Sequence, residues 1–299
     1  MPIPDKKYID YSKIYSPSKI DCFYKCPKQY HFSYIDPVYS KMKNKLNKYP
    51  ENIWPFNTLG KAVHNAITFF YHLPENQRTE ENLKEQLKKT WESEAMWNKK
   101  PPLGKWGGFE SLEEEREYYK NAILMLKNFL KIAEIAPDFK YLPTDNLKKS
   151  IDDYINLITP INKDYDISGK FDLIVQQGNA LHIIDFKTGK NEEGADDFQL
   201  RFYKLLAEEN FKKPVKKTSF YFLRSGSIKE SESKKEDSKK IKEEILNKIK
   251  EIKETKDFIP QPSGLCKFCI FKTFCPKKGE VSQGVKDVKK EDYPSDLPF

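Results

Sequence analysis

The chain has 299 residues, enough to bury one large core or one core with a sizeable helical insertion. Lys and Arg outnumber Asp and Glu by 53 to 45. This net charge of +8 suits a polyanionic partner, although 33% charged residues also fit a highly charged soluble surface. No window approaches the ~18 apolar residues of a membrane span, and no hydrophobic signal region opens the chain, so we expect a soluble cytoplasmic protein.

Helical patterns dominate the part of the chain that follows the N-terminal segment. Apolar residues recur at helical spacing in 59–73, which carries His64, and again around 83–95 and over 112–136. The segment 101–108 contains Pro, Gly and Trp, and we expect it to separate the last two helices. The sequence therefore predicts three helices ahead of the first strand.

Strand patterns come next. The segments 147–158, 165–176 and 180–187 are rich in β-branched and aromatic residues and are separated by turn signals, which predicts a meander of three strands. A helix over about 195–209 and a strand over 218–224 are expected to follow. The order helix, three strands, helix, strand indicates an α/β sandwich.

The last part of the chain is dominated by Lys and Glu. Isoleucine recurs at helical spacing within 239–256, which favours a solvated amphipathic helix. The Ser/Lys/Glu run 229–238 is expected to be mobile, and the polar tail 279–299 to be poorly ordered.

Two carboxylates and a lysine mark the expected strands. Asp185 and Lys187 are two residues apart and therefore face the same side of their strand, and Asp172 lies thirteen positions before Asp185. One or two carboxylates usually hold Mg²⁺ or Mn²⁺, which activates water at a phosphate while a lysine stabilises the developing charge. The pattern predicts metal-dependent phosphodiester hydrolysis. Taken alone, Asp172 also fits a strand terminus, and the other two residues also fit a surface salt bridge.

Three further polar residues fall close to this pattern. Gln199 and Tyr203 are four residues apart on the helix that follows, so they share one face, although such a pair also fits a core tyrosine beside a surface amide. His64 lies among apolar residues, where a structural histidine is the ordinary interpretation. A neutral imidazole there would also serve as a metal ligand, more naturally for Mn²⁺ than for Mg²⁺.

Three of the five cysteines are crowded together, as Cys266-x2-Cys269-x5-Cys275. In a reducing compartment this spacing favours metal binding over disulfides, and a fourth ligand has to come from Cys22 or Cys26. The spacing leaves open an iron-sulfur cluster, Zn²⁺ in four thiolates, or a group of buried free cysteines.

These residues together resemble the ordered motifs of RecB-like nucleases in the PD-(D/E)xK superfamily. The motifs are LGKAVH at 59–64, GKFD at 169–172, IDFKTG at 184–189 and Q-x-x-x-Y at 199–203. The segment 16–32, with its C-P-x-x-Y-x-F pattern, resembles the opening of the iron-sulfur branch, which includes the AddB nuclease domain and the Cas-four CRISPR-associated exonucleases. The likeness runs from about 14 to 278, except for the helical part 75–145, and it departs from the family at Phe171, where a proline is nominal.

The resemblance implies a restriction-endonuclease-like α/β core with a helical insertion and an iron-sulfur-bound module made by the two ends of the chain. It implies Mg²⁺ or Mn²⁺ ligands at His64, Asp172 and Asp185, with Lys187 as the catalytic lysine and Gln199 and Tyr203 as accessory residues. It also selects Cys26 over Cys22, and implies a 4Fe-4S cluster held by Cys26, Cys266, Cys269 and Cys275.

The function that the resemblance implies is a metal-dependent DNA nuclease, an exonuclease on single-stranded ends, in DNA repair or CRISPR adaptation. Helicases or CRISPR adaptation proteins would be its partners, and no membrane is involved. The alternative is a catalytically silent iron-sulfur DNA-binding subunit of a larger nuclease-helicase or adaptation complex. Lysine-rich surfaces predict phosphate contacts without base reading. Trp54, Trp97 and Trp106 would stack on unpaired bases if they are not core residues.

Six regions are therefore expected: an N-terminal segment with the first cluster cysteine (1–58), a core helix with His64 (59–74), a helical insertion (75–146), the nuclease core (147–228), a Lys/Glu-rich helix with the cysteine cluster (229–278) and a flexible tail (279–299).

Overall fold

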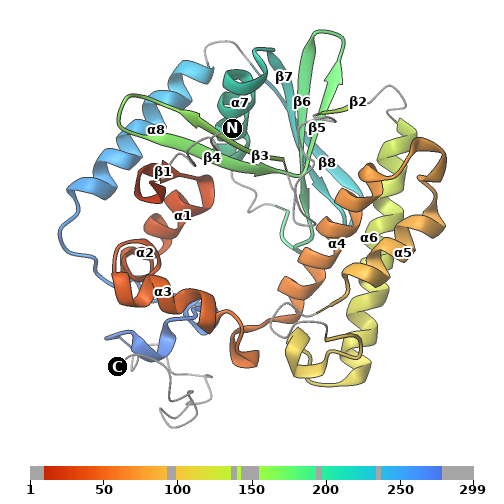
Figure 1. Ribbon diagram of the computed structural model, residues 1–299, viewed down its shortest axis with the longest axis horizontal. Helices are drawn as coiled ribbons and strands as arrows, with labels where there is room; N and C mark the ends of the chain where they lie inside the picture. Colours follow the sequence, from red (N-terminus) through yellow and green to blue (C-terminus); the bar gives the residue numbers. More distant parts are fainter. Residues whose placement is uncertain are drawn as a thin grey trace, which may run out of the picture.

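Two β-sheets form the centre of the computed structural model, which describes residues 10–92, 99–135, 140–142, 155–192, 197–233 and 237–277 (Figure 1). The larger sheet has the strand order β2-β5-β6-β7-β8, with bounds β2 Lys140–Leu142, β5 Leu173–Gln177, β6 Ala180–Lys187, β7 Val215–Phe222 and β8 Ser227–Glu232. The smaller has the order β1-β4-β3, with bounds β1 Ile14–Tyr15, β4 Asp166–Phe171 and β3 Ile155–Pro160. The pairs β1–β4 and β6–β7 are parallel and the others antiparallel.

Helices flank the sheets on two sides. Their bounds are α1 Pro17–Lys25, α2 Pro27–Tyr34, α3 Pro37–Leu46, α4 Pro55–His72, α5 Glu80–Thr90, α6 Leu112–Ile135, α7 Asp197–Phe211 and α8 Asp237–Glu254. In Figure 1, α4, α5 and α6 lie side by side on the right, and α1 to α3 descend on the left towards the C-terminal segment. In the part of the chain described, no helix combines the length and apolar character needed to span a bilayer.

Local sequence explains where several helices begin. Proline occupies the first position of each of α1 to α4, where its missing N–H costs nothing and its fixed φ suits the helix. The Ser16, Asp36 and Thr79 side chains cap α1, α3 and α5 by accepting backbone N–H bonds. The helix expected over 59–73 is confirmed as α4, with an earlier start at Pro55.

The parallel pair β6–β7 holds the centre of the larger sheet. All of β6 except its last residue is buried, as its mostly apolar sequence predicts for a strand covered on both faces, and His182 and Asp185 are buried with it. The helix α7 connects β6 to β7 and contacts β3 and β4 as well, so it bridges the two sheets. Phe202, Leu205 and Leu206 form its buried face.

The expected three-strand meander is wrong in one respect. The segment 165–176 forms two strands, β4 and β5, which belong to different sheets and meet at a bend at Asp172. There Asp172 Oδ2 accepts the backbone N–H of Phe186 in β6 at 2.8 Å, so a side chain supplies a bond that a continuous ladder would supply from the backbone. The first expected strand is described only as β3, and 147–154 lies outside the described residues.

The expectation of mobility at 229–238 is wrong for its first part. Residues 227–232 form β8, an edge strand that pairs antiparallel with β7 and leaves every side chain exposed. An exposed edge strand with charged side chains has the same composition as a solvated loop, so the sequence alone did not distinguish the two. The following helix is α8, as expected, and its isoleucines, Ile241, Ile245, Ile249 and Ile252, are buried. Residues 234–236 and the tail 279–299 lie outside the described residues.

A second, smaller core joins the two ends of the described chain. Phe32 of α2 and Met42 and Leu46 of α3 are buried together with Phe271 of the C-terminal segment. The rings of Phe32 and Phe271 lie 5.4 Å apart between centroids. The C-terminal segment is thereby fixed beneath α2 and α3 (Figure 1).

A buried polar contact docks the helical insertion onto the larger sheet. The side chain of Asn128 in α6 donates to the carbonyl of Leu223 at 2.9 Å, and Tyr221 donates to the carbonyl of Asn128 at 2.5 Å. The helix α6 also packs on α4. This contact fixes α4, and the histidine it carries, relative to β6.

Candidate active site

Four elements bring the expected site residues together. Asp172 lies at the bend between β4 and β5, Asp185 and Lys187 lie at the end of β6, and His64 projects from α4. From α7 come Gln199 and Tyr203. All six side chains line one open cavity of about 360 Å³, together with Lys170, Phe186, Thr188 and Gly189.

Asp172 and His64 form one half of this site. The Nδ1 atom of His64 lies 2.9 Å from Oδ1 of Asp172, while the other carboxylate oxygen accepts the Phe186 N–H. Burial by itself lowers the pKa of His64, but the charge of Asp172 and the hydrogen bond with it outweigh burial and raise the pKa above its usual value. The imidazole is therefore held against a carboxylate at the edge of the cavity.

Asp185 and Lys187 form the other half. Asp185 is only 5% exposed, and its Oδ2 lies 2.6 Å from Lys187 Nζ. This short approach is an ion pair without hydrogen-bond geometry, since that buried oxygen accepts no hydrogen bond. Burial raises the pKa of Asp185 to about 6, the nearby charge of Asp172 adds to the rise, and Lys187 opposes it.

Gln199 links the two members of that pair. Its Oε1 accepts a hydrogen bond from Lys187 Nζ at 2.8 Å, and its Nε2 donates to Oδ1 of Asp185 at 3.0 Å. The same amide nitrogen lies 3.2 Å from the hydroxyl of Tyr203, whose pKa burial raises. Lys187 also lies 4.8 Å from the centre of the Phe220 ring. The amide therefore fixes the direction of both the acid and the lysine.

Two glycines let the elements approach one another at the site. A Cβ on Gly169 in β4 would lie 2.8 Å from the ring of Tyr203, and a Cβ on Gly60 in α4 would lie 3.0 Å from Oγ1 of Thr188. Any larger residue has to displace these neighbours. The glycines therefore set how closely α7 and α4 pack against the strands that carry the carboxylates.

A second cavity, of about 790 Å³, continues from the first towards α1. It shares Lys170, Lys187 and Gln199 with the first cavity and extends to Ser16, Ser18, Asp21 and Lys25. Sequence reasoning missed Lys170 as a site residue, although it stands inside the GKFD motif. It also missed the start of α1, whose serines carry no distinguishing signal. Three lysines and several hydroxyls border the combined cavity beside the aspartates, and these lysines and hydroxyls are groups that contact a phosphate backbone.

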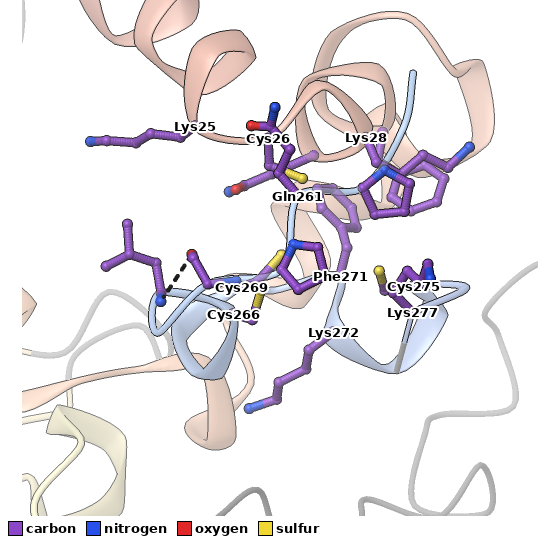
Figure 2. A pocket seen from close by; sticks show the side chains of 16 residues that line it. Lys25, Cys26, Lys28, Gln261, Cys266, Cys269, Phe271, Lys272, Cys275 and Lys277 are labelled. Atoms are coloured by element: carbon purple, nitrogen blue, oxygen red, sulfur yellow. Dashed lines mark hydrogen bonds between the residues drawn. The ribbon is translucent and has the colours of Figure 1, made fainter. Parts of the chain in front are cut away.

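The four expected cluster cysteines line a separate, small pocket of about 70 Å³ (Figure 2). Cys26 lies between α1 and α2, while the other three come from the C-terminal segment. Burial raises the pKa of Cys269 to about 12, and the charges of Cys26, Cys266 and Cys275 add to the rise, since all three lie close to it. The N–H of Ser263 donates to Cys266 Sγ at 3.3 Å.

Cys22 stands apart from this pocket. It belongs to α1, packs against the main core and is absent from the lining of the pocket. Burial raises its pKa to about 11. The pocket is therefore lined by Cys26 and not by Cys22.

Within the ranges that the structure describes, no three or more His, Cys, Asp or Glu side chains are grouped so that they could hold a metal ion. Contacts within the protein account for this at the carboxylate site: His64 is turned onto Asp172, and Asp185 onto Lys187. Metal binding there requires these side chains to exchange partners. The donors nevertheless fit a hard divalent cation, because two carboxylates and an imidazole line one cavity and carboxylate oxygens suit Mg²⁺ and Mn²⁺.

The mixed α/β fold brings Asp172, at the bend after β4, into one cavity with Asp185 and Lys187 at the end of β6, an arrangement typical of metal-dependent nucleases. The chain matches the model of the PD-(D/E)XK nuclease superfamily over residues 14–276 and belongs to that superfamily. Nucleases of this superfamily use divalent metals such as Mg²⁺ or Mn²⁺, and DNA is the substrate that membership implies.

Other comparisons add little. No curated protein matches the chain. A solved structure described as "Crystal structure of SSO0001" is similar to it, with 15% sequence identity, a TM-score of 0.40 and coverage of 90% of this chain and 89% of that one.

Proposed function

We propose that the protein is an exonuclease that hydrolyses single-stranded DNA from its ends. One observation carries the hydrolytic part of the proposal. The buried Asp185 and the half-buried Lys187 are both held by Gln199, in one cavity with Asp172 and His64. The preference for ends and single strands rests on the resemblance to the RecB-like branch.

The chemistry assigns a role to each side chain. His64, Asp172 and Asp185 would hold the divalent cation, which supplies a water of lowered pKa and neutralises charge on the phosphate. Lys187, directed by Gln199, places its ammonium beside the phosphate oxygen on which charge develops. Lys170 and the hydroxyls near the start of α1 contact neighbouring phosphates without reading bases.

We propose in addition that Cys26, Cys266, Cys269 and Cys275 hold a 4Fe-4S cluster. The four thiols line one pocket, and soft thiolates are the ligands that such clusters take. The N–H bond from Ser263 to Cys266 is of the kind that tunes a cluster. Zn²⁺ in the same four thiolates is the alternative occupant, which metal analysis and visible absorption distinguish.

The cellular role follows from the same resemblance. We propose that the protein trims DNA in repair or in CRISPR adaptation, with CRISPR adaptation proteins or a helicase as partner. No Walker motif occurs in this sequence, so unwinding is assigned to the partner.

Cleavage of end-labelled DNA tests the nuclease proposal. Wild-type protein, purified without oxygen, is incubated with single-stranded or duplex DNA and Mg²⁺, Mn²⁺ or no added metal. The comparison includes Asp185→Asn and, as a matched control, Asp164→Asn, which removes an exposed carboxylate in the turn before β4. We expect metal-dependent cleavage from the ends of single strands that Asp185→Asn abolishes and Asp164→Asn retains.

The same assay addresses the alternative function. DNA binding without cleavage under any metal condition would indicate a catalytically silent DNA-binding subunit. Equal cleavage by wild type and Asp185→Asn would place the active site elsewhere.

A further inference from the structure

An aromatic cluster lies where α4 begins, next to the cysteine-bearing segment. The Trp54 and Phe56 rings are stacked, 6.3 Å apart between centroids and 11° from parallel. The ring of Phe268 meets both edge-on, at 4.7 Å from Trp54 and 5.3 Å from Phe56. Phe56 is 45% exposed, so the cluster presents an apolar ring to solvent instead of closing a core.

The cluster is aligned with the active site along α4. Phe56, Gly60 and His64 are four residues apart and form one row on the helix surface. At 1.5 Å per residue, Phe56 lies about 12 Å along the axis from His64. Gly60, in the middle of this row, packs against Thr188, the residue after Lys187. Because Gly60 has no side chain, no side chain in this row of α4 projects between the Phe56 ring and the active site. A strand of about three to four nucleotides at ~3.4 Å stacked spacing would bridge that length.

Two lysines give the cluster the charge of a polyanion site. Lys267 Nζ lies 4.9 Å from the centre of the Phe268 ring, and Lys272 Nζ lies 5.7 Å from that of Trp54. The indole N–H of Trp54 is buried and has no hydrogen-bond partner among the described residues, although buried tryptophans usually find one. An exposed ring beside half-buried rings that carry lysines over their faces is a composition found on surfaces that bind single-stranded nucleic acid.

We propose that Trp54, Phe56 and Phe268 form a base-stacking platform for single-stranded DNA, a few nucleotides from the phosphate that is cleaved. The proposal rests on the nuclease function proposed above and adds a reason for strand preference. Unpaired bases present free faces that stack on Phe56, whereas the bases of a duplex are already stacked on one another. Lys267 and Lys272 bind the adjoining phosphates.

Binding measured apart from catalysis tests the platform. Fluorescently labelled oligothymidine is titrated without added Mg²⁺ or Mn²⁺ against wild type, Phe56→Ala, Phe56→Trp and the control Tyr11→Ala, which removes an aromatic ring that is 73% exposed outside the platform. We expect Phe56→Ala to weaken binding about five- to hundredfold, and Phe56→Trp and Tyr11→Ala to preserve it. Wild-type affinity in Phe56→Ala would overturn the proposal.

An abasic nucleotide then locates the contact. Oligonucleotides lacking one base at successive positions from the end are bound to wild type and to Phe56→Ala. We expect one position a few nucleotides from the end to weaken binding to wild type and to have little effect in the variant, because both changes remove the same stacking interaction. Equal losses in the two proteins at every position would refute a contact with Phe56.

A small substrate separates this proposal from the nuclease proposal. Thymidine 5′-p-nitrophenyl phosphate is too short to reach Phe56, so Phe56→Ala should hydrolyse it at the wild-type rate. Loss of this hydrolysis in a Phe56→Ala protein of wild-type thermal stability would show that Phe56 acts through the active site. That result would overturn the platform proposal. If the wild type cleaves nothing, the nuclease proposal fails, while dependence of oligothymidine binding on Phe56 in Asp185→Asn still supports the platform.

Discussion

Gly169 and Tyr203 are so close that the glycine has no room for a side chain: a Cβ at Gly169 would lie 2.8 Å from Cε1 of the tyrosine ring. The hydroxyl of that tyrosine lies 3.2 Å from the Gln199 amide, which in turn holds Asp185 and Lys187. The absence of a side chain at Gly169 therefore lets Tyr203 and Gln199 hold Asp185 and Lys187 in their observed orientation.

We expect Gly169→Ala to displace Tyr203 and α7 from the sheet. Overpacking of this kind lowers the free energy of unfolding by about 1–3 kcal/mol. A displacement near 1 Å is enough to lower cleavage about 100-fold. Urea unfolding and a cleavage time course measure the two effects. Gly264→Ala is the matched control, because its added Cβ meets no atom within 4 Å and this glycine lines neither cavity of the site. Equal cleavage by the two variants would contradict the connection.

Gln199 is expected to act as a positioning residue. Gln199→Ala removes one hydrogen bond from Lys187 and one from Asp185, and should lower kcat about 10- to 100-fold while KM for DNA changes little. Steady-state kinetics on single-stranded DNA gives the two constants separately. Gln177→Ala, which removes an exposed amide at the end of β5, should behave as wild type. A change confined to KM would instead place Gln199 in DNA binding.

The assignment of the cluster ligands predicts opposite results for two neighbouring cysteines. Cys26→Ala should lose most of the visible absorption and bound iron, together with thermal stability, because this thiol lines the pocket from the N-terminal side. Cys22→Ala should keep its iron, since Cys22 packs against the main core instead. Iron analysis and absorption spectra of anaerobically purified protein decide the matter. A colourless Cys22→Ala protein beside a brown Cys26→Ala protein would reverse the assignment.

His182 makes stability depend on pH. Burial lowers its pKa to about 4, and its Nε2 lies 2.7 Å from Ser219 Oγ. The unfolded chain, with a histidine pKa near 6.5, therefore takes up a proton before the folded chain does, so stability falls as pH decreases from about 6.5 to about 4. This group should contribute a loss of about 2 kcal/mol between pH 7.5 and 5.

Urea unfolding of wild type and His182→Asn at several pH values checks this contribution. The variant should lose less stability on acidification than wild type by about that amount. Parallel curves for the two proteins would show that His182 does not titrate as its burial requires.

The sequence was sufficient to predict the helices and strands whose hydrophobic patterns are long and regular. The apolar row of α4 and the mostly apolar sequence of β6 predicted both elements, because burial on a fixed face imposes those periods. The break between β4 and β5 was missed, because strand-like composition runs on through Asp172 and only the hydrogen bond to Phe186 ends the ladder there. The two-residue strand β1 is too short to leave any periodic pattern.

The candidate site, too, could be predicted from the sequence only in part. Motif order predicted which residues belong together, and the structure places His64, Asp172 and Lys187 in one cavity. Spacing along the chain carries no information about pairs such as Trp54 and Phe268, which are brought together only by the path of the C-terminal segment. Contacts between distant segments therefore had to come from the structure.

The small core that joins Phe32 to Phe271 also determines when the protein can finish folding during its synthesis. Its two rings are 239 positions apart in the chain, so the ribosome has to add that many residues after the first ring before the second exists. At about 5–20 residues per second this takes roughly 10 to 50 s. For that time the apolar faces of α2 and α3 lack the ring that covers them in the folded protein.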